Sequence, residues 1–170
     1  MRRVTFSFTE RLTLVPVELS QVVKPTLWVL LGIFVASGIG SNIFSLAAAW
    51  PRSLMATAAY ASGILAGALA APALLPWIPA RSFALKGAIT GSVCGLGIIL
   101  IFLSALNFWG ALALLLCSTA ISSFLAMNFT GSTPFTSPSG VEKEMRKAIP
   151  LQALTALVAV VAWIGSGFTN

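Results

Sequence analysis

Long uncharged stretches dominate the pattern of hydrophobic and polar positions along the chain. Four of them stand out, at residues 25–51, 53–80, 87–141 and 148–170. A helix needs about 20 residues to cross the hydrocarbon core of a bilayer, so the third stretch is long enough for two crossings. Its middle, Leu106 to Gly110, combines a turn-forming Asn with an interfacial Trp. We predict an all-α membrane protein with five transmembrane helices, over residues 26–48, 54–75, 84–106, 108–127 and 149–168.

The first 24 residues have a different pattern. Val4, Phe6 and Phe8 alternate with polar residues, which is typical of a strand with one apolar face. No other stretch reads as a strand, so this one would need a sheet supplied by another domain. We therefore divide the chain into a strand-like cytoplasmic tail and juxtamembrane connector at 1–24, the end of a missing soluble domain, and a transmembrane domain at 25–170. The alternative is a disordered start with coincidental alternation.

The loop at residues 128–148 is rich in Gly, Pro, Ser and Thr, yet it contains Phe129 and Phe135, which a flexible linker does not need. Ser139 and Glu142 form a capping box that predicts a helix start near Gly140. Glu142 and Arg146 are spaced as a helical ion pair. We expect a short interfacial helix here, ended or redirected by Pro150 before the last span.

We expect this loop and the tail to dock a soluble domain. The candidate docking residues are Val4, Phe6, Phe8, Phe129, Thr130, Gly131, Phe135, Ser139, Glu142 and Arg146. Direct ligand contact through free amides at the helix start, or a purely structural loop, are the alternatives.

Composition indicates the class of protein, and the distribution of charged residues predicts its orientation in the membrane. Hydrophobic residues make up 58% of the 170 residues and charged residues only 8%, too few to cover a surface that faces water on all sides. The net charge of +6 follows from basic residues between the apolar stretches, so we interpret it as membrane topology and expect no nucleic-acid partner. Nine basic residues fall on the side of the N-terminus: Arg2, Arg3, Arg11, Lys24, Arg81, Lys86, Lys143, Arg146 and Lys147. Arg52 alone falls on the other side, which predicts a cell (inner) membrane protein with its N-terminus and functional loops in the cytoplasm and its C-terminus outside.

The chain offers little chemistry of its own. It has no His, which excludes a His-based catalytic triad and a His-ligated zinc, and its two Cys are too few for an iron–sulfur site with four Cys ligands. Cys94 and Cys117 fall at similar depths on neighbouring predicted helices. A soft metal such as Hg(II) suits thiolates, but inert buried thiols are the alternative interpretation. We predict no catalytic residue and no bound cofactor in this chain.

Small residues recur at four-residue spacing in two of the predicted helices. They are Ala59, Gly63, Gly67 and Ala71 in one, and Gly87, Gly91 and Gly95 in the other. Such ridges allow close approach of helix backbones in a bilayer. They predict a bundle that holds itself together, and a substrate path between the ridges is the alternative.

Three strings carry a resemblance to a known family. They are MRRVTF at residues 1–6, ERLTLVPVE at 10–18 and NFTGSTPFTSPSGVEKEMR at 128–146, followed by AIP at 148–150. They resemble the membrane half of the corrinoid protein of mercury methylation, a relative of the corrinoid subunit of the acetyl-CoA synthase complex. The family's signature helix, Asn-Val/Ile-Trp-Cys-Ala-Ala/Gly-Gly-Lys, does not occur in this sequence.

The resemblance implies a function for the anchor. In that family a corrinoid domain transfers a methyl group from cobalt to Hg(II), giving methylmercury, and a ferredoxin-like iron–sulfur protein supplies electrons. The corrinoid would then belong to an associated domain, present in cis on a longer protein or in trans as a separate chain. The resemblance thus implies a membrane anchor for a corrinoid-dependent methyltransferase. The alternatives are a small transporter-like protein that moves a neutral or metal–thiol species, or a structural membrane subunit.

Overall fold

The structure, a computed structural model, describes residues 25–41, 43–80, 82–128 and 138–169, and for residues 138–141 it describes the backbone alone. The predicted tail at 1–24 lies outside these residues. The described part begins with a helix at Pro25–Gly38. A two-stranded hairpin follows, in which β1 (Ile39–Gly40) pairs antiparallel with β2 (Ile43–Phe44). The rest is helical: α2 (Leu46–Leu65), a π-helical turn (Ala66–Ala70), α3 (Ala71–Ala73), α4 (Phe83–Ile101), a 3₁₀ turn (Leu103–Ala105), α5 (Phe108–Asn128) and α6 (Pro138–Ser166).

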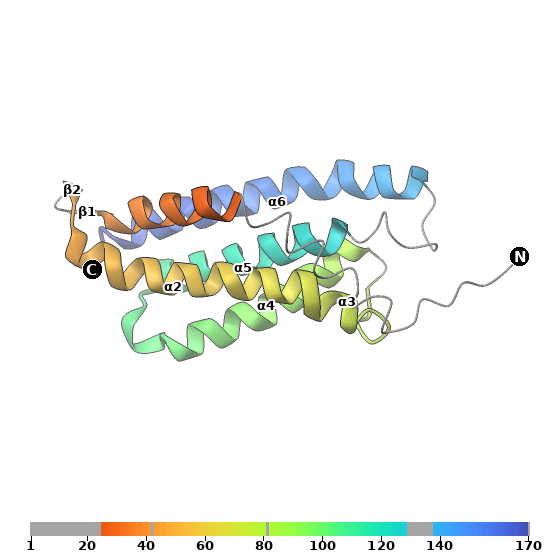
Figure 1. Cartoon of the computed structure of the whole chain (residues 1–170), viewed down its shortest axis with the longest axis horizontal. Coiled ribbons are helices and arrows are strands. Elements are labelled where there is room, and N and C mark those ends of the chain that lie inside the picture. Colours follow the sequence, from red (N-terminus) through yellow and green to blue (C-terminus); the bar gives the residue numbers. More distant parts are fainter. Residues whose placement is uncertain (1–24, 42, 81, 129–137, 170) are drawn as a thin grey trace, which may run out of the picture.

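The helices form an elongated bundle (Figure 1). The helix Pro25–Gly38 and α6 lie along one side, α4 lies along the other, and α5 packs against α2, α4 and α6. Four helical segments are long and apolar enough to cross a membrane: Leu46–Ala73, Phe83–Ile101, Phe108–Asn128 and Glu142–Ser166. The described part of the first helix is shorter. The helical membrane-protein class is thus supported, with four candidate spans and one shorter apolar helix.

Glycines bring the backbones of the bundle into contact, as the small-residue ridges predict. A Cβ added to Gly91 on α4 would lie 2.6 Å from the Cβ of Ser122 on α5, and one added to Gly67, in the π-helical turn after α2, would lie 2.6 Å from the Ser122 carbonyl oxygen. Neither position has room for a methyl group. The ridges therefore pack α2 and α4 against α5.

Hydroxyl groups tie the same helices together. Ser118 donates to the Gly91 carbonyl at 2.9 Å, and one turn further along α5 Ser122 donates to the Gly87 carbonyl at 2.7 Å. The next hydroxyl, that of Ser123, donates to the Ala84 carbonyl at 2.8 Å. These bonds satisfy polar groups in an interior without water, and they hold α4 and α5 in one register.

The predicted boundary between the first two spans is wrong. The first helix ends at Gly38 rather than near residue 48, and α2 begins at Leu46, where Ser45 caps it by accepting a hydrogen bond from the Ala48 amide at 3.3 Å. Two glycines in the 38–40 segment favour a break there, and Ser45 is a preferred N-cap residue. Pro51 lies inside α2, where it removes a single helical hydrogen bond near the start of the helix.

Arg52 is consequently a helical residue and not part of a loop. Its guanidinium donates to the carbonyls of Ser37 at 2.8 Å and Trp163 at 2.5 Å, so it joins the C-terminal ends of the first helix and α6. It also donates to Ser166 Oγ at 2.9 Å and lies 4.9 Å from the centre of the Trp163 ring. A cation is favourable at the negative end of a helix, and here one side chain serves two helices. We call this group of residues the Arg52 clamp.

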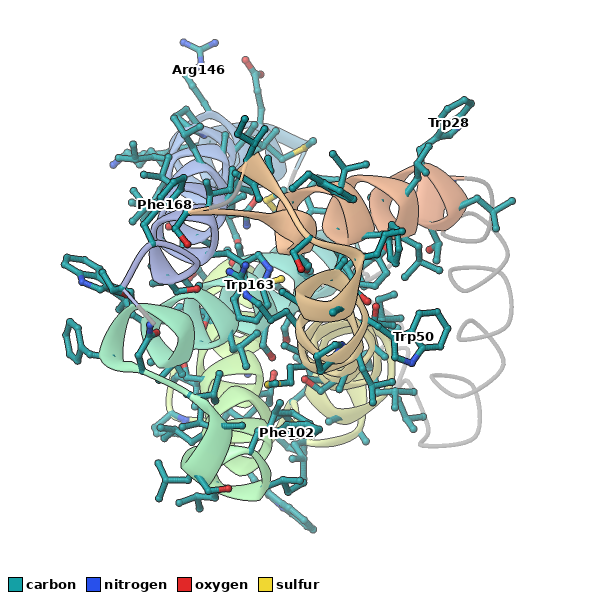
Figure 2. The ribbon with its side chains drawn as sticks, turned by 90° about the vertical axis from the view of Figure 1, so that its left-hand side faces the viewer. Trp28, Trp50, Phe102, Arg146, Trp163 and Phe168 are labelled. Carbon is teal, nitrogen blue, oxygen red and sulfur yellow. The ribbon has the colours of Figure 1, made fainter. Side chains whose placement is uncertain are left out.

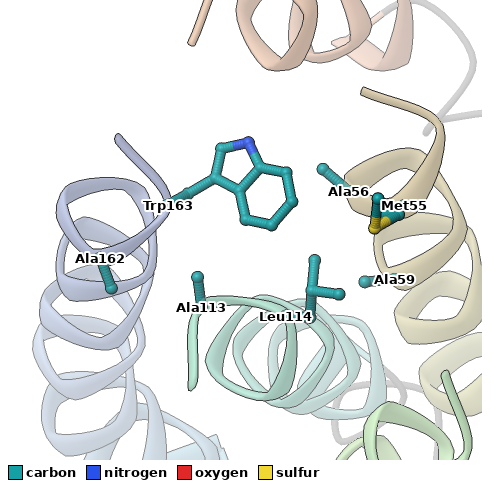
Figure 3. Close-up of a cluster of buried hydrophobic side chains, with 7 residues drawn as sticks. All are labelled: Met55, Ala56, Ala59, Ala113, Leu114, Ala162 and Trp163. Atoms are coloured by element: carbon teal, nitrogen blue, oxygen red, sulfur yellow. The ribbon is translucent and has the colours of Figure 1, made fainter. Parts of the chain in front are cut away.

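Trp163 is the largest side chain of the apolar core beside this clamp. It is only 6% exposed, and Figure 3 shows it reaching from α6 above α5 toward Ala56 on α2. Its indole nitrogen donates to Ser37 Oγ at 2.9 Å. Trp28 and Trp50 instead point away from the bundle (Figure 2), as interfacial or lipid-facing indoles do.

The predicted break at Pro150 is also wrong. The short interfacial helix and the last span form one continuous helix, α6, with Pro150 inside it. Proline removes the bond that its amide would give to the carbonyl of residue 146, and that turn is exposed, so solvent can satisfy the carbonyl instead.

Candidate functional site

The starts of α4 and α6 meet at the end of the bundle opposite the Arg52 clamp (Figure 1). Glu144 on α6 accepts a hydrogen bond from the Ala84 amide at 2.8 Å, in the first turn of α4. Ser82, the N-cap of α4, accepts from the Leu85 amide at 3.3 Å. A carboxylate is favourable at the positive end of a helix, so Glu144 fixes α6 against α4.

Basic side chains gather at this end. Lys86 on α4 donates to the Leu75 carbonyl beyond α3, while Lys143 and Lys147 lie one turn apart on α6. We call this end, with the described residues Lys86, Lys143, Arg146 and Lys147, the basic end. Lys143, Glu144 and Lys147 line a cleft of about 500 Å³ between α6 and α4, and Gln152 also lines it.

The predicted Glu142–Arg146 ion pair is present, with 2.9 Å between the carboxylate and the guanidinium. Both side chains are exposed, at 71% and 79% respectively, so the pair faces away from the bundle and is accessible to a partner. Ser139 lies in the first turn of α6, which begins at Pro138, and its side chain is outside the described residues. The other candidate docking residues also lie outside them: Val4, Phe6, Phe8, Phe129, Thr130, Gly131 and Phe135.

α6 is longer than a membrane span, so its start extends beyond the hydrocarbon core at this end. Its 29 residues extend about 43 Å at 1.5 Å per residue, which exceeds a hydrocarbon core of about 30 Å. The excess of roughly nine residues corresponds to the charged turns before Ala148. From Glu142 to Lys147, every side chain except the half-buried Glu144 is exposed.

Sequence reasoning missed Glu144, Lys143 and Lys147 as residues of one cleft. The two lysines carried a signal, because four-residue spacing places both on one face of a helix. The bond from Glu144 to the start of α4 joins residues 60 positions apart, and nothing in the local pattern indicates it.

The two cysteines are free, and both are partly buried. Cys117 on α5 lines a cavity together with residues of the first helix, α2 and α6. The residues of α5 that face Gly91 and Gly95 of α4 are Leu115, Ser118 and Thr119. Within the described residues there is no group of three or more His, Cys, Asp or Glu side chains that could hold a metal ion. Binding of a soft metal by Cys94 and Cys117 stays a prediction.

Comparison of the chain with protein-family models, with curated proteins and with solved structures gives no match. The fold and the site therefore rest on the sequence and the geometry described above.

Proposed function

We propose that this chain is the membrane anchor of a corrinoid-dependent methyltransferase system that methylates Hg(II), and that its basic end docks the corrinoid domain. That domain would be joined in cis or bound in trans, and a ferredoxin-like iron–sulfur protein would be a further partner. The corrinoid would carry the methyl group, and this chain would hold the corrinoid domain at the membrane surface. Tethering two partners at one surface raises their effective concentration and fixes their orientation.

The observation that carries the proposal is the projecting start of α6. It presents an accessible ion pair, Glu142 and Arg146, on a helix held firmly to the bundle through Glu144. This is the segment in which the resemblance to the mercury-methylation family is densest. A rigid charged helix beyond the hydrocarbon core suits docking of a soluble domain.

The distribution of charge supports a cytoplasmic position for this end. Of the described basic residues, Lys86, Lys143, Arg146 and Lys147 lie at the basic end and Arg52 lies at the other. Under the positive-inside rule, the basic end faces the cytoplasm and the Arg52 clamp faces outward. We accordingly propose a location in the cell membrane, with the loops that dock the partner in the cytoplasm.

The tightly packed interior supports an anchor rather than a carrier. The glycine contacts leave no space for a methyl group between α5 and its neighbours α2 and α4. The hydroxyl bonds between α4 and α5 fix their relative position.

Co-purification tests the proposal. The full chain, tagged and extracted in mild detergent from a host that makes the corrinoid protein, should bring down a cobalt-containing polypeptide, measured as cobalt per mole of chain. Reversing both charges of the accessible pair, Glu142→Arg with Arg146→Glu, preserves the pair within the helix and should lower recovery about ten-fold. Leu154→Ala, an exposed change at membrane depth on the same helix, is the matched control. Absence of cobalt from the wild-type preparation, or methyl transfer to Hg(II) by the isolated chain, would refute the anchor role.

A further inference from the structure

The cleft between the starts of α4 and α6 changes in character along its length. Lys143 and Lys147 of α6 and the N-cap residue Ser82 line one part of it. Leu85 and Leu151, which are both exposed, line it further along the two helices. A cleft with ammonium groups at one end and aliphatic side chains at the other suits a ligand that joins an anionic group to an apolar one. We call it the basic cleft.

The two lysines of the basic cleft are available to bind an anion. The other described cations at this end are engaged, because Lys86 donates to a backbone carbonyl and Arg146 pairs with Glu142. Lys143 and Lys147 have no hydrogen-bond or ion-pair partner in the part of the chain that the structure describes. They are exposed and one turn apart on α6, so a single anion can contact both.

Glu144 is the acidic side chain among the residues that line the basic cleft. Its carboxylate accepts the hydrogen bond from the Ala84 amide at 2.8 Å, at the positive end of α4, where a negative charge is favourable. Two ammonium groups against one engaged carboxylate leave the cleft with a net positive charge. It therefore favours an anion.

Hydrogen bonds to α6 on both sides of Ala84 give the level at which α4 begins. The Ala84 amide donates to Glu144. The Ala84 carbonyl accepts from Ser123, which in turn accepts from Gln152. The start of α4 therefore lies between the levels of residues 144 and 152 of α6, near Ala148, where the hydrocarbon core begins.

Depth along α6 indicates the source of the anion. At 1.5 Å per residue, Lys147 lies about 1.5 Å and Lys143 about 7.5 Å outside Ala148, and Leu151 lies about 4.5 Å inside it. The headgroup region is about 5–7.5 Å thick on each side of the core. The ammonium groups are thus at the level of lipid phosphates, and the aliphatic part of the cleft is at the level of the lipid chains.

We propose that the basic cleft binds the phosphate of an anionic membrane phospholipid between Lys143 and Lys147, with a hydrocarbon chain of that lipid lying along Leu85 and Leu151. The inference rests on the membrane placement proposed above. It is separate from the docking of a corrinoid domain, because the docking ion pair lies about a quarter of a turn away around α6. A phosphate without an amine in the same headgroup is preferred, since that amine would neutralise it.

Lipid binding to the full chain in detergent, counted by native mass spectrometry, tests the charge requirement. Dioleoyl-phosphatidylglycerol should bind about ten-fold more tightly than dioleoyl-phosphatidylcholine, which has the same chains but a quaternary ammonium beside its phosphate. Lys147→Gln should weaken binding of phosphatidylglycerol about five-fold. Arg146→Gln removes the same charge from the neighbouring residue, which faces away from the bundle, and should weaken it by about two-fold or less. The docking pair has no role in this assay because no partner protein is present.

A filled cleft and a phosphate ester without chains test the apolar part of the site. Ala88 of α4 also lines the basic cleft, so Ala88→Leu should obstruct the lipid chain and weaken binding of phosphatidylglycerol about five-fold. Gly97→Leu, on the same helix but in open space, should leave binding unchanged. Glycerol phosphate supplies the phosphate alone and should not displace the lipid at about 100-fold excess, because it cannot bury a chain.

The outcomes separate this site from its alternatives. Equal affinity for the two lipids, or equal binding by Lys147→Gln and Arg146→Gln, would overturn the proposal, as would equal binding by Ala88→Leu and Gly97→Leu. Displacement by glycerol phosphate at an equal concentration would identify a site for soluble phosphate esters and overturn the assignment to a lipid. Absence of cobalt from the co-purification, with phosphatidylglycerol still bound, would refute the docking role alone.

Discussion

The Arg52 clamp gives the sharpest test of how the bundle is held together. Arg52→Ala removes donors to the carbonyls of Ser37, Ile39 and Trp163 and to the Ser166 hydroxyl, as well as the contact with the indole ring. Each hydrogen bond contributes a net ~1 kcal/mol and the cation–π contact a similar amount, and losing them leaves helix-end carbonyls without a donor. After the desolvation of the half-buried guanidinium is allowed for, the expected loss is about 3–5 kcal/mol.

The assay is thermal unfolding of the detergent-solubilised chain followed by circular dichroism. A loss of about 3–5 kcal/mol corresponds to a fall in Tm of roughly 6–20 °C for a chain of this size. Arg52→Lys keeps the charge but loses the planar fork that reaches two helices, so about half of the fall is expected. Arg146→Ala removes an exposed arginine from a surface pair and serves as the matched control, with a change of about 2 °C or less. A Tm of Arg52→Ala within about 2 °C of wild type would refute the reasoning, as would full rescue by Lys.

Three further predictions follow from the packing, the helix cap and the charge distribution. Gly91→Ala places a methyl group 2.6 Å from the Ser122 Cβ and should destabilise the chain by about 1–3 kcal/mol, seen as a lower Tm, while Gly97→Ala, with open space around it, should not. Glu144→Ala removes the acceptor of the Ala84 amide at the start of α4, while Ser82 remains as the N-cap. It should cost about 0.5–2 kcal/mol in the same melt, and Glu144→Gln, which keeps an oxygen acceptor, should recover most of it. Lys143→Cys, in a chain without its native cysteines, should react with an impermeant maleimide only after the membrane is opened; labelling of intact cells would contradict the proposed orientation.

The sequence predicts the middle of the bundle well because its signals there are local. The charge-free stretch at 87–141 and its Asn107 turn predict helices at 84–106 and 108–127, and the structure has α4 and α5 at Phe83–Ile101 and Phe108–Asn128. Asn107 accepts from the Gly110 amide at 2.8 Å and so acts as a cap, in keeping with the turn expected there. Glu142 and Arg146 pair because their spacing alone brings them together.

The misplaced boundaries have a physical cause. The uncharged stretches show which segments are apolar. Helix ends predicted from them are correct only where a charged residue or a proline ends the helix. Arg52 lies within a helix because two helix ends supply oxygens for its guanidinium, and those oxygens come from residues 15 and 111 positions away. Pro150 lies within α6 because the turn before it is open to solvent. Both exceptions depend on tertiary surroundings that local patterns do not contain.

The partners of Arg52 are far apart in the order of synthesis. Ser37 and Ile39 emerge from the ribosome before Arg52, but Trp163 and Ser166 emerge more than a hundred residues later. Until the last helix has been inserted, the arginine has only two of its four hydrogen-bond acceptors. The C-terminal ends of the first helix and α6 are not yet joined through its guanidinium. A chain truncated before Trp163 would thus retain most of its apolar helices yet lack the final closure, and membrane quality-control proteases should remove it faster than the complete chain.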